Sequence, residues 1–232
     1  MSRAFAFASF AASLVGAGLM AAAAATTPLG GYVSEAGAGS SGHATTYRLG
    51  AAGLALGQAL FALALSYSPA SRWVWAVPLV PLTVSLVALD AVFGGVSAVV
   101  SCSPGCPLPP HETSTARDLV HGGASILAVG LLSLALLGVA VFWPPGPLVR
   151  PSRIAAAIVV PLVAASGLAI LIVGRGYLTG LLERAVLVAA VGWTLVACAL
   201  LVRSAPPPAR PAWSARRWRR VRADRSVSRL TP

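Results

Sequence analysis

Charge is scarce in this sequence. Only 10% of its 232 residues are charged, six of them are acidic, and all 17 basic residues are arginine because the chain has no lysine. A soluble domain of this length needs charged side chains to cover its exterior. The mean hydropathy of +0.81 is typical of a chain that lipid surrounds. The composition therefore excludes a soluble globular protein and indicates an integral membrane protein.

The chain also lacks the local motifs that name a reaction. It contains no glycine-rich phosphate loop, no nucleophile elbow, and no dense cluster among its three cysteines and three histidines. Nothing in the sequence requires a cofactor. The net charge of +11 is not accompanied by a nucleic-acid-binding motif, so no nucleic acid partner is expected.

Long apolar runs, in contrast, are abundant. Six of them approach the length of about 20 residues that a helix needs to cross the hydrocarbon core of a bilayer. They fall at about residues 4–25, 49–67, 73–100, 119–143, 154–174 and 181–202. The sequence therefore predicts an all-α fold, a bundle of six transmembrane helices over residues 1–203, followed by a basic Pro- and Arg-rich tail over residues 204–232 that we expect to be disordered.

The placement of the arginines predicts the orientation, because short Arg-rich loops stay in the cytoplasm. With the N-terminus inside, the outer segments carry only Arg48, Arg117, Arg175 and Arg184, and the tail alone holds the cluster from Arg203 to Arg229. We therefore expect both termini in the cytoplasm and the long connections after the first and third helices outside. An Ala-rich chain without lysine fits a high-GC bacterial genome, so the expected location is the bacterial plasma membrane.

The first apolar run has two interpretations. Arg3, the apolar core and the small residues 23–25 before Thr26 are also typical of a secretory signal with a cleavage site. However, the run exceeds the usual signal core of about 7–15 residues. A membrane-spanning helix is therefore favoured, and cleavage, which would leave five helices, is the alternative.

Polar residues gather between residues 101 and 125. Cys102 and Cys106 flank Ser-Pro-Gly, a turn-forming sequence that brings the two sulfurs together. On the outer side of a membrane the simplest outcome is a disulfide. Two free thiols are the next alternative, and a metal site is the last, because the pair offers few ligands. Cys198, in the sixth run, is expected to be a small apolar core residue.

The candidate catalytic residues are Asp118, His121 and Ser125. If the fourth helix begins near Thr115, their spacings of three and four place them on one helical face near the outer interface. Imidazole beside carboxylate suits a metal site or a base-activated hydroxyl. The favoured interpretation is structural, however. Thr115-x-x-Asp118 has the form of a capping box, and His121 one turn later can hydrogen-bond a neighbouring helix.

A polar pocket at the outer face is a second candidate site. Asp90 lies inside the third apolar run, where an ionisable group is costly unless it is paired or faces a cavity. Pairing with Arg117, His121 or Arg184 within the bundle is the favoured interpretation of Asp90, and a role in ligand or proton handling is the alternative. The candidate pocket residues are the charged or titratable groups of the outer segments, namely Glu35, Arg48, Asp90, His111, Glu112, Glu183 and Arg184. A divalent metal is a candidate cofactor here, with Asp90, Asp118 and His121 as its ligands.

The basic tail predicts an electrostatic partner. Arginines just inside a membrane attract anionic lipid, at about 1 kcal/mol for each residue near the surface. Trp213 and Trp218 would anchor the tail at the interface. Membrane lipids are therefore the expected partners, and the alternative is a solvated tail that only enforces topology. The sequence specifies no protein partner or oligomeric state.

Four short features of the chain resemble the bacterial membrane family called domain of unknown function 998. They are Ser34-Glu35 leading into Tyr47-Arg48-Leu49-Gly50, the acid in the third helix, Thr115-x-x-Asp118-x-x-His121, and the run from Gly180-Leu-Leu-Glu-Arg184 to Trp193. The resemblance covers about residues 4–203. It implies a multi-pass membrane protein, and the family brings no established activity.

Three functions remain as hypotheses. The leading one is a non-enzymatic membrane component that binds a lipid, a small ligand or a partner at its outer face, because every candidate catalytic residue has a structural explanation. The second is a membrane-embedded, metal-assisted lipid hydrolase, with Asp90, Asp118 and His121 as ligands or base and Ser125 as a polarising hydroxyl. A transporter is third, because broken helices and related halves are scarce.

Overall fold

The computed structural model describes residues 1–68 and 79–204 and confirms the six-helix all-α bundle over them. Each helix is long and apolar enough to cross a membrane. The helices are α1 (Ser2–Ala24), α2 (Ala44–Ser66), α3 (Leu79–Val99), α4 (Ala116–Phe142), α5 (Val149–Ile172) and α6 (Tyr177–Ser204), with a short 3-10 helix, η1 (Val33–Gly37), before α2. The predicted tail from residue 205 onward and the predicted helical residues 73–78 lie outside the described residues.

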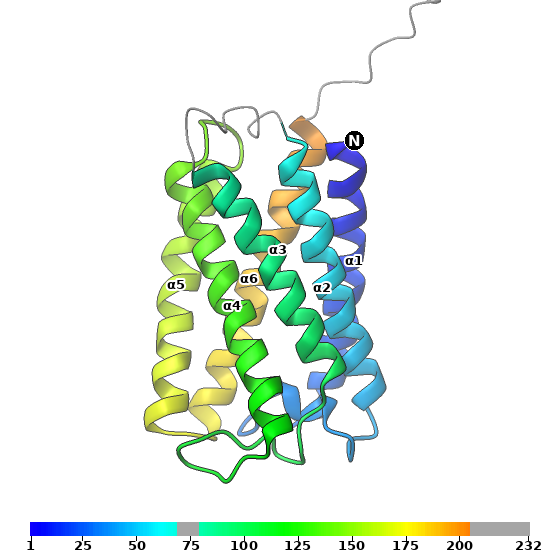
Figure 1. The fold of residues 1–232 in the computed structure, drawn as a ribbon, viewed down its shortest axis with the longest axis vertical. Helices are drawn as coiled ribbons and strands as arrows, with labels where there is room; N and C mark the ends of the chain where they lie inside the picture. Colours follow the sequence, from blue (N-terminus) through cyan, green and yellow to red (C-terminus); the bar gives the residue numbers. More distant parts are fainter. Residues whose placement is uncertain (69–78, 205–232) are drawn as a thin grey trace, which may run out of the picture.

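The helices form a closed ring. Each packs against its neighbours in sequence, and α1 packs against α6 to complete the circle (Figure 1). The start of α1, the α4–α5 connection and the end of α6 lie together at one end, which we call the terminal end. Residues 25–43, 100–115 and 173–176 lie at the other, the loop end. The two segments expected to be the long outer connections therefore share one end of the bundle.

The apolar core is concentrated between the helices, and large apolar side chains also cover the outside of the ring. Phe61 and Trp193 meet edge to face, with ring centroids 5.6 Å apart, and the Trp193 indole donates to Ser152 Oγ at 3.0 Å. Outward-facing apolar residues occur on every helix, for example Leu14, Leu56, Leu89, Leu134, Leu171 and Val188. Such an exterior suits contact with lipid.

Glycine brings α1 and α2 into close backbone contact. A Cβ on Gly16 would lie 2.6 Å from the Leu54 nitrogen and 2.8 Å from the Gly50 carbonyl oxygen. One on Gly50 would lie 2.6 Å from the Met20 nitrogen. Small residues permit this approach between membrane helices, where dispersion contacts supply much of the attraction.

Two helices begin five residues before the predicted positions, because polar residues at their starts find partners without ending the helix. α2 includes Arg48, whose guanidinium donates to the carbonyl oxygens of Ala98 (3.2 Å) and Val99 (2.9 Å) at the end of α3. α5 includes Arg153, which donates to the Ala140 carbonyl oxygen at 3.0 Å. Pro151 lies in the first turn of α5, where proline is tolerated.

Candidate ligand-binding cavity

The ring encloses a cavity of about 250 Å³ that extends toward the loop end. Residues of all six helices line it, and Tyr32, Ser34, Cys102, Cys106 and Leu108 contribute from the loop end. Most of the lining side chains are apolar or small, including Met20, Leu54, Val129, Leu132, Val163, Ile170, Val186 and Leu187. A mostly apolar cavity with a few polar groups is the usual form of a small-molecule site.

The deep part of the cavity contains two buried oxygen atoms that have no hydrogen-bond partner among the described residues. One is Oε1 of Gln58, whose Nε2 donates to Thr194 Oγ1 at 3.1 Å. The other is Oδ2 of Asp90, which is only 6% exposed. Asp90 precedes the end of α3 by nine residues, which places it about 14 Å deeper along the helix axis. Neither the expected Arg117 nor Arg184 forms an ion pair with Asp90 in the described structure.

His121 lies in the part of the cavity nearest the loop end. Its Nδ1 lies 3.0 Å from the Ser97 carbonyl oxygen and 2.6 Å from that of Val100. Carbonyl oxygens only accept, so Nδ1 carries the proton and the imidazole binds the free end of α3. In the neutral ring Nε2 is then an acceptor. It is buried and has no partner within the described part of the chain.

The Ser125 hydroxyl belongs to a local hydrogen-bond network. It donates to the His121 carbonyl oxygen at 2.9 Å and lies 2.7 Å from Ser97 Oγ. Ser97, Ser125 and His121 all line the cavity. The predicted common face of Asp118, His121 and Ser125 is therefore present, and all three residues line the cavity.

Asp118 has the capping role that the sequence predicts. Its Oδ2 accepts from the Thr115 nitrogen at 2.9 Å and from Thr115 Oγ1 at 2.7 Å, and a capping box starts α4. Its Oδ1 accepts from the Ser103 nitrogen at 2.6 Å, and Ser103 Oγ donates to Oδ2 at 3.1 Å. This carboxylate joins the 100–115 segment to α4 through four hydrogen bonds.

Cys102 and Cys106 form a disulfide at the loop end. Their Cα atoms are 5.1 Å apart, within the usual disulfide range. The turn between them closes through a hydrogen bond from the Cys106 nitrogen to the Ser103 carbonyl oxygen at 2.9 Å. Gly105 adopts a left-handed conformation with φ of 86°, which glycine accepts without strain. Cys198 is free, buried and distant in sequence, as expected.

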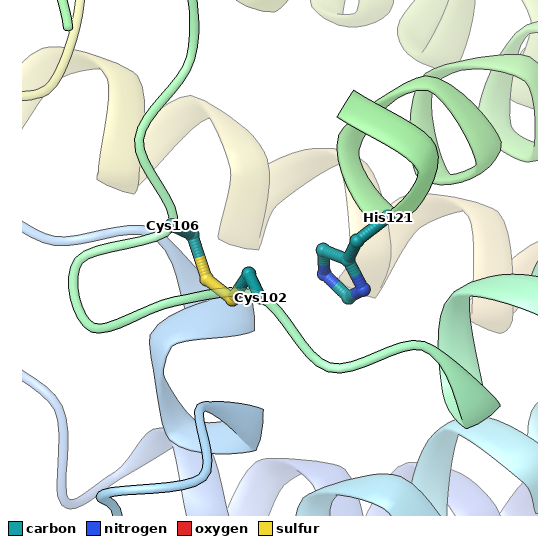
Figure 2. Close-up of side chains that lie close together, drawn as sticks. All are labelled: Cys102, Cys106 and His121. Atoms are coloured by element: carbon teal, nitrogen blue, oxygen red, sulfur yellow. A yellow bond between two sulfur atoms is a disulfide. The ribbon is translucent and has the colours of Figure 1, made fainter. Parts of the chain in front are cut away.

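The structure brings His121 beside this disulfide (Figure 2). One ligand atom from each of Cys102, Cys106 and His121 lies within 4.8 Å of the others. Among the described residues this is the one group of three or more potential metal-ligating side chains that close together. Asp90 and Asp118, the two other candidate metal ligands, are not part of it.

The charged residues predicted to form an outer pocket mainly hold the connections in place. Glu183 lines the cavity, but its Oε2 accepts from the Val33 nitrogen at 2.8 Å. Arg184 donates to carbonyl oxygens of Gly31 (3.1 Å), Gly180 (2.9 Å) and Pro28 (3.2 Å) and to Thr27 Oγ1 (2.9 Å). The two neighbouring residues of α6 therefore fasten the 25–43 segment to the bundle.

Glu35, His111 and Glu112 lie outside the cavity lining. Glu35 forms an ion pair with Arg175, with Oε1 2.8 Å from Nε and Oε2 2.6 Å from Nη2, and this bond raises the pKa of the Arg175 guanidinium above its ordinary value. His111 Nε2 lies 3.1 Å from the Leu171 carbonyl oxygen at the end of α5. Glu112 is half-buried in the same loop segment.

Tyr32 supplies a phenol at the loop end of the cavity. Its burial, with a smaller contribution from the nearby carboxylates of Glu112 and Glu183, raises its pKa to about 12. The hydroxyl therefore stays protonated at neutral pH. It is a neutral group able to donate a hydrogen bond into the cavity.

No protein-family model, curated protein or solved structure matches this chain. The likeness to the domain of unknown function 998 family therefore stays a prediction.

Sequence reasoning missed Gln58, Ser97 and Tyr32 as cavity residues. Gln58 left a detectable signal, because it is an amide in the middle of an apolar helix and polar groups at that depth are costly. Ser97 left none, since a serine in a helix commonly bonds to a carbonyl group of that helix and is therefore not unusual in an apolar run. Which of these side chains face one another depends on how the six helices close into a ring.

Proposed function

We propose that this protein is a non-enzymatic, multi-pass component of the bacterial plasma membrane that binds a small amphiphile or lipid within its helical ring. The observation that carries the proposal is a pair of oxygen atoms, Gln58 Oε1 and Asp90 Oδ2, that find no hydrogen-bond partner in the described part of the chain and lie at the deep end of a mostly apolar cavity. The resemblance to the domain of unknown function 998 family adds a membrane location and no activity.

The chemistry of the two atoms indicates what the ligand carries. The Gln58 oxygen can only accept a hydrogen bond, and the Asp90 carboxyl likewise accepts when a cationic ligand pairs with it and ionises it. A buried polar atom without a partner costs about 1–3 kcal/mol, and more when it is charged. A ligand with an amine or hydroxyl at one end would remove that cost, while its apolar part would contact Leu132, Val163 and their neighbours.

A metal-assisted hydrolase is supported less well. Its proposed ligands Asp90, Asp118 and His121 do not form a group within 4.8 Å among the described residues. The four hydrogen bonds to Asp118 occupy its carboxylate in the cap of α4. Within residues 1–68 and 79–204, the Ser125 hydroxyl donates its proton to a carbonyl of its own helix and not to a side-chain base.

The proposal can be tested with the full chain in lipid nanodiscs. The probe is a single-chain primary alkylamine that carries a photoreactive diazirine, and the comparison probe has the same chain ending in a methyl ester, which cannot donate. We expect the amine to label cavity residues such as Val129 and Leu132, with the ester labelling them weakly. Asp90→Leu should lower labelling by about tenfold or more, as the loss of a charged hydrogen bond predicts.

Thr83→Val is the matched control. Thr83 is buried on the same helix as Asp90, does not line the cavity and bonds to the Leu79 carbonyl oxygen at 2.8 Å. Its replacement should leave labelling unchanged. Equal labelling by both probes, or unchanged labelling of Asp90→Leu, would contradict a donor-selective site.

A further inference from the structure

The part of the cavity nearest the loop end has a different chemistry from its deep part. Here two sulfur atoms and one imidazole nitrogen come together from separate elements, the 100–115 segment and α4. Figure 2 shows one ring nitrogen of His121 turned toward the Cys102–Cys106 pair. Because Nδ1 is bound to the carbonyls of Ser97 and Val100, the nitrogen that faces the sulfurs is Nε2.

The hydrogen bonds of His121 prepare Nε2 to be a ligand. A metal-binding histidine commonly donates its other N–H to a carbonyl or carboxylate, which fixes the tautomer and the orientation of the ring. Both carbonyl contacts of Nδ1 meet that description. His121 is only 3% exposed, and its Nε2 lacks a hydrogen-bond partner within the described chain. The lone pair is therefore buried, oriented and unused.

We propose that Cys102, Cys106 and His121 form a redox-gated site for a soft d¹⁰ divalent cation, of which Zn²⁺ is the representative. With the disulfide closed, the sulfurs are not thiolates and the site is blocked. With the disulfide open, the two sulfurs and Nε2 supply three ligands of the types that Zn²⁺ prefers.

The geometry is close to what the ion requires. Zinc binds sulfur at about 2.3 Å and histidine nitrogen at about 2.0–2.1 Å, so its ligand atoms lie roughly 3.5–4 Å apart. The three atoms lie within 4.8 Å of one another. Opening the disulfide frees both cysteine side chains to rotate by the remaining distance. The cavity leaves space for water as a fourth ligand.

The gating reaction is a thiol–disulfide exchange with a dithiol as the reductant. The dithiol gives two electrons and two protons, the Cys102–Cys106 bond breaks to two thiols, and the dithiol closes to its own disulfide. When Zn²⁺ binds, each thiol releases its proton to water and forms a sulfur–zinc bond. Metal binding therefore accompanies the release of two protons.

The test uses the full chain in detergent, without and with reduction by a phosphine, which does not compete as a thiol ligand. Each form is equilibrated with Zn²⁺ by dialysis, and metal is measured per chain by elemental mass spectrometry. We expect about one Zn²⁺ per chain in the reduced protein and none in the oxidised protein. With Cd²⁺ as the probe, only the reduced protein should develop a sulfur-to-metal charge-transfer band.

Variants separate this site from other thiols and from unfolding. Cys106→Ser and His121→Asn should each weaken binding by more than the 10- to 100-fold that loss of an outer-sphere partner costs. Cys198→Ser removes the buried thiol of α6 and should bind like the wild type. Helical circular dichroism and a single gel-filtration peak establish that each variant is folded.

Two results would overturn the proposal. One is a reduced, folded wild-type protein that binds no Zn²⁺, or a Cys106→Ser variant that binds Zn²⁺ as tightly as the reduced wild type. The other is a disulfide that phosphine cannot open while the protein stays folded. Neither result would affect amphiphile binding at Asp90, which is measured on the oxidised protein, so the two proposals fail separately.

Discussion

Asp90 and Asp118 are two buried carboxylates in opposite situations. Asp118 accepts four hydrogen bonds at the start of α4. Asp90 faces the cavity, and its Oδ2 has no partner in the described structure. A buried carboxylate whose oxygen atoms have hydrogen-bond partners stabilises the fold. A buried carboxylate with an oxygen atom that lacks a partner is usually retained for binding.

Substitutions should therefore change stability in opposite directions. We expect Asp118→Ala to lower the free energy of unfolding by about 2 kcal/mol or more, since it removes a cap and leaves buried donors unpaired. We expect Asp90→Leu to raise the free energy of unfolding of the ligand-free protein by about 1 kcal/mol or more. Thermal unfolding in detergent, followed by helical circular dichroism, measures both.

Glu112→Ala provides the control for Asp118, because Glu112 is a half-buried acid of the adjacent loop outside the cap. If Asp118→Ala were as stable as Glu112→Ala, the hydrogen bonds of the cap would contribute little. If Asp90→Leu were less stable than the wild type, Asp90 would have a structural partner.

Single residues also show where sequence analysis succeeds. The spacing of Thr115, Asp118, His121 and Ser125 was sufficient to predict one helical face and its cap, because both follow from helix geometry alone. The approach of His121 to Cys102 and Cys106 was not predictable. It depends on the path of the 100–115 segment across the end of the bundle, and no periodicity in the sequence encodes that path.

At the scale of elements, the connections at the loop end are held by arginines of unequal importance. Arg184 is partly buried and donates to four oxygen atoms, three of them in residues 27–31. Arg175 is 40% exposed and pairs with Glu35 alone in the described structure. Exposed ion pairs contribute little to stability, whereas buried carbonyls that lose a charged donor are costly.

We therefore expect Arg184→Ala to loosen the 25–43 segment and Arg175→Ala to leave it nearly unchanged. The readout is limited chymotrypsin digestion of the detergent-purified protein, with the cut after Tyr32 identified by mass spectrometry. Tyr32 is only 4% exposed in the intact fold, so cleavage there reports opening. Equal cleavage rates for the two variants would show that Arg184 does not fasten this segment.

The element boundaries show which part of the hydropathy argument fails. The runs gave six helices because a membrane imposes a minimum apolar length. The runs placed the start of α2 too late, because Arg48 interrupts the apolar pattern without interrupting the helix. Its guanidinium reaches α3 instead, and a single chain segment cannot reveal a partner on another helix.

At the scale of the whole molecule, the start of α1 and the end of α6 lie together at the terminal end, which leads to a prediction about orientation. We expect the terminal end in the cytoplasm, since the Arg-rich sequence from residue 205 onward follows directly after the end of α6. In a Cys198→Ser background, a membrane-impermeant thiol reagent should label Ser40→Cys in intact cells and Gly146→Cys only after lysis. Both positions are exposed, at opposite ends of the bundle. The reverse pattern would invert the topology and place the disulfide in the cytoplasm.

The closure of the ring through α1 and α6 makes it matter whether the number of helices is even or odd. In a ring of helices joined by short connections, neighbours run in opposite directions all the way round only if their number is even. Each helix macrodipole then lies between two opposed ones, which is the favourable arrangement in a medium of low dielectric constant. Without α1, the two helices left at the gap would be α2 and α6, which both run from the loop end to the terminal end. The ring would then either remain open to lipid along the cavity or close with one pair of aligned dipoles.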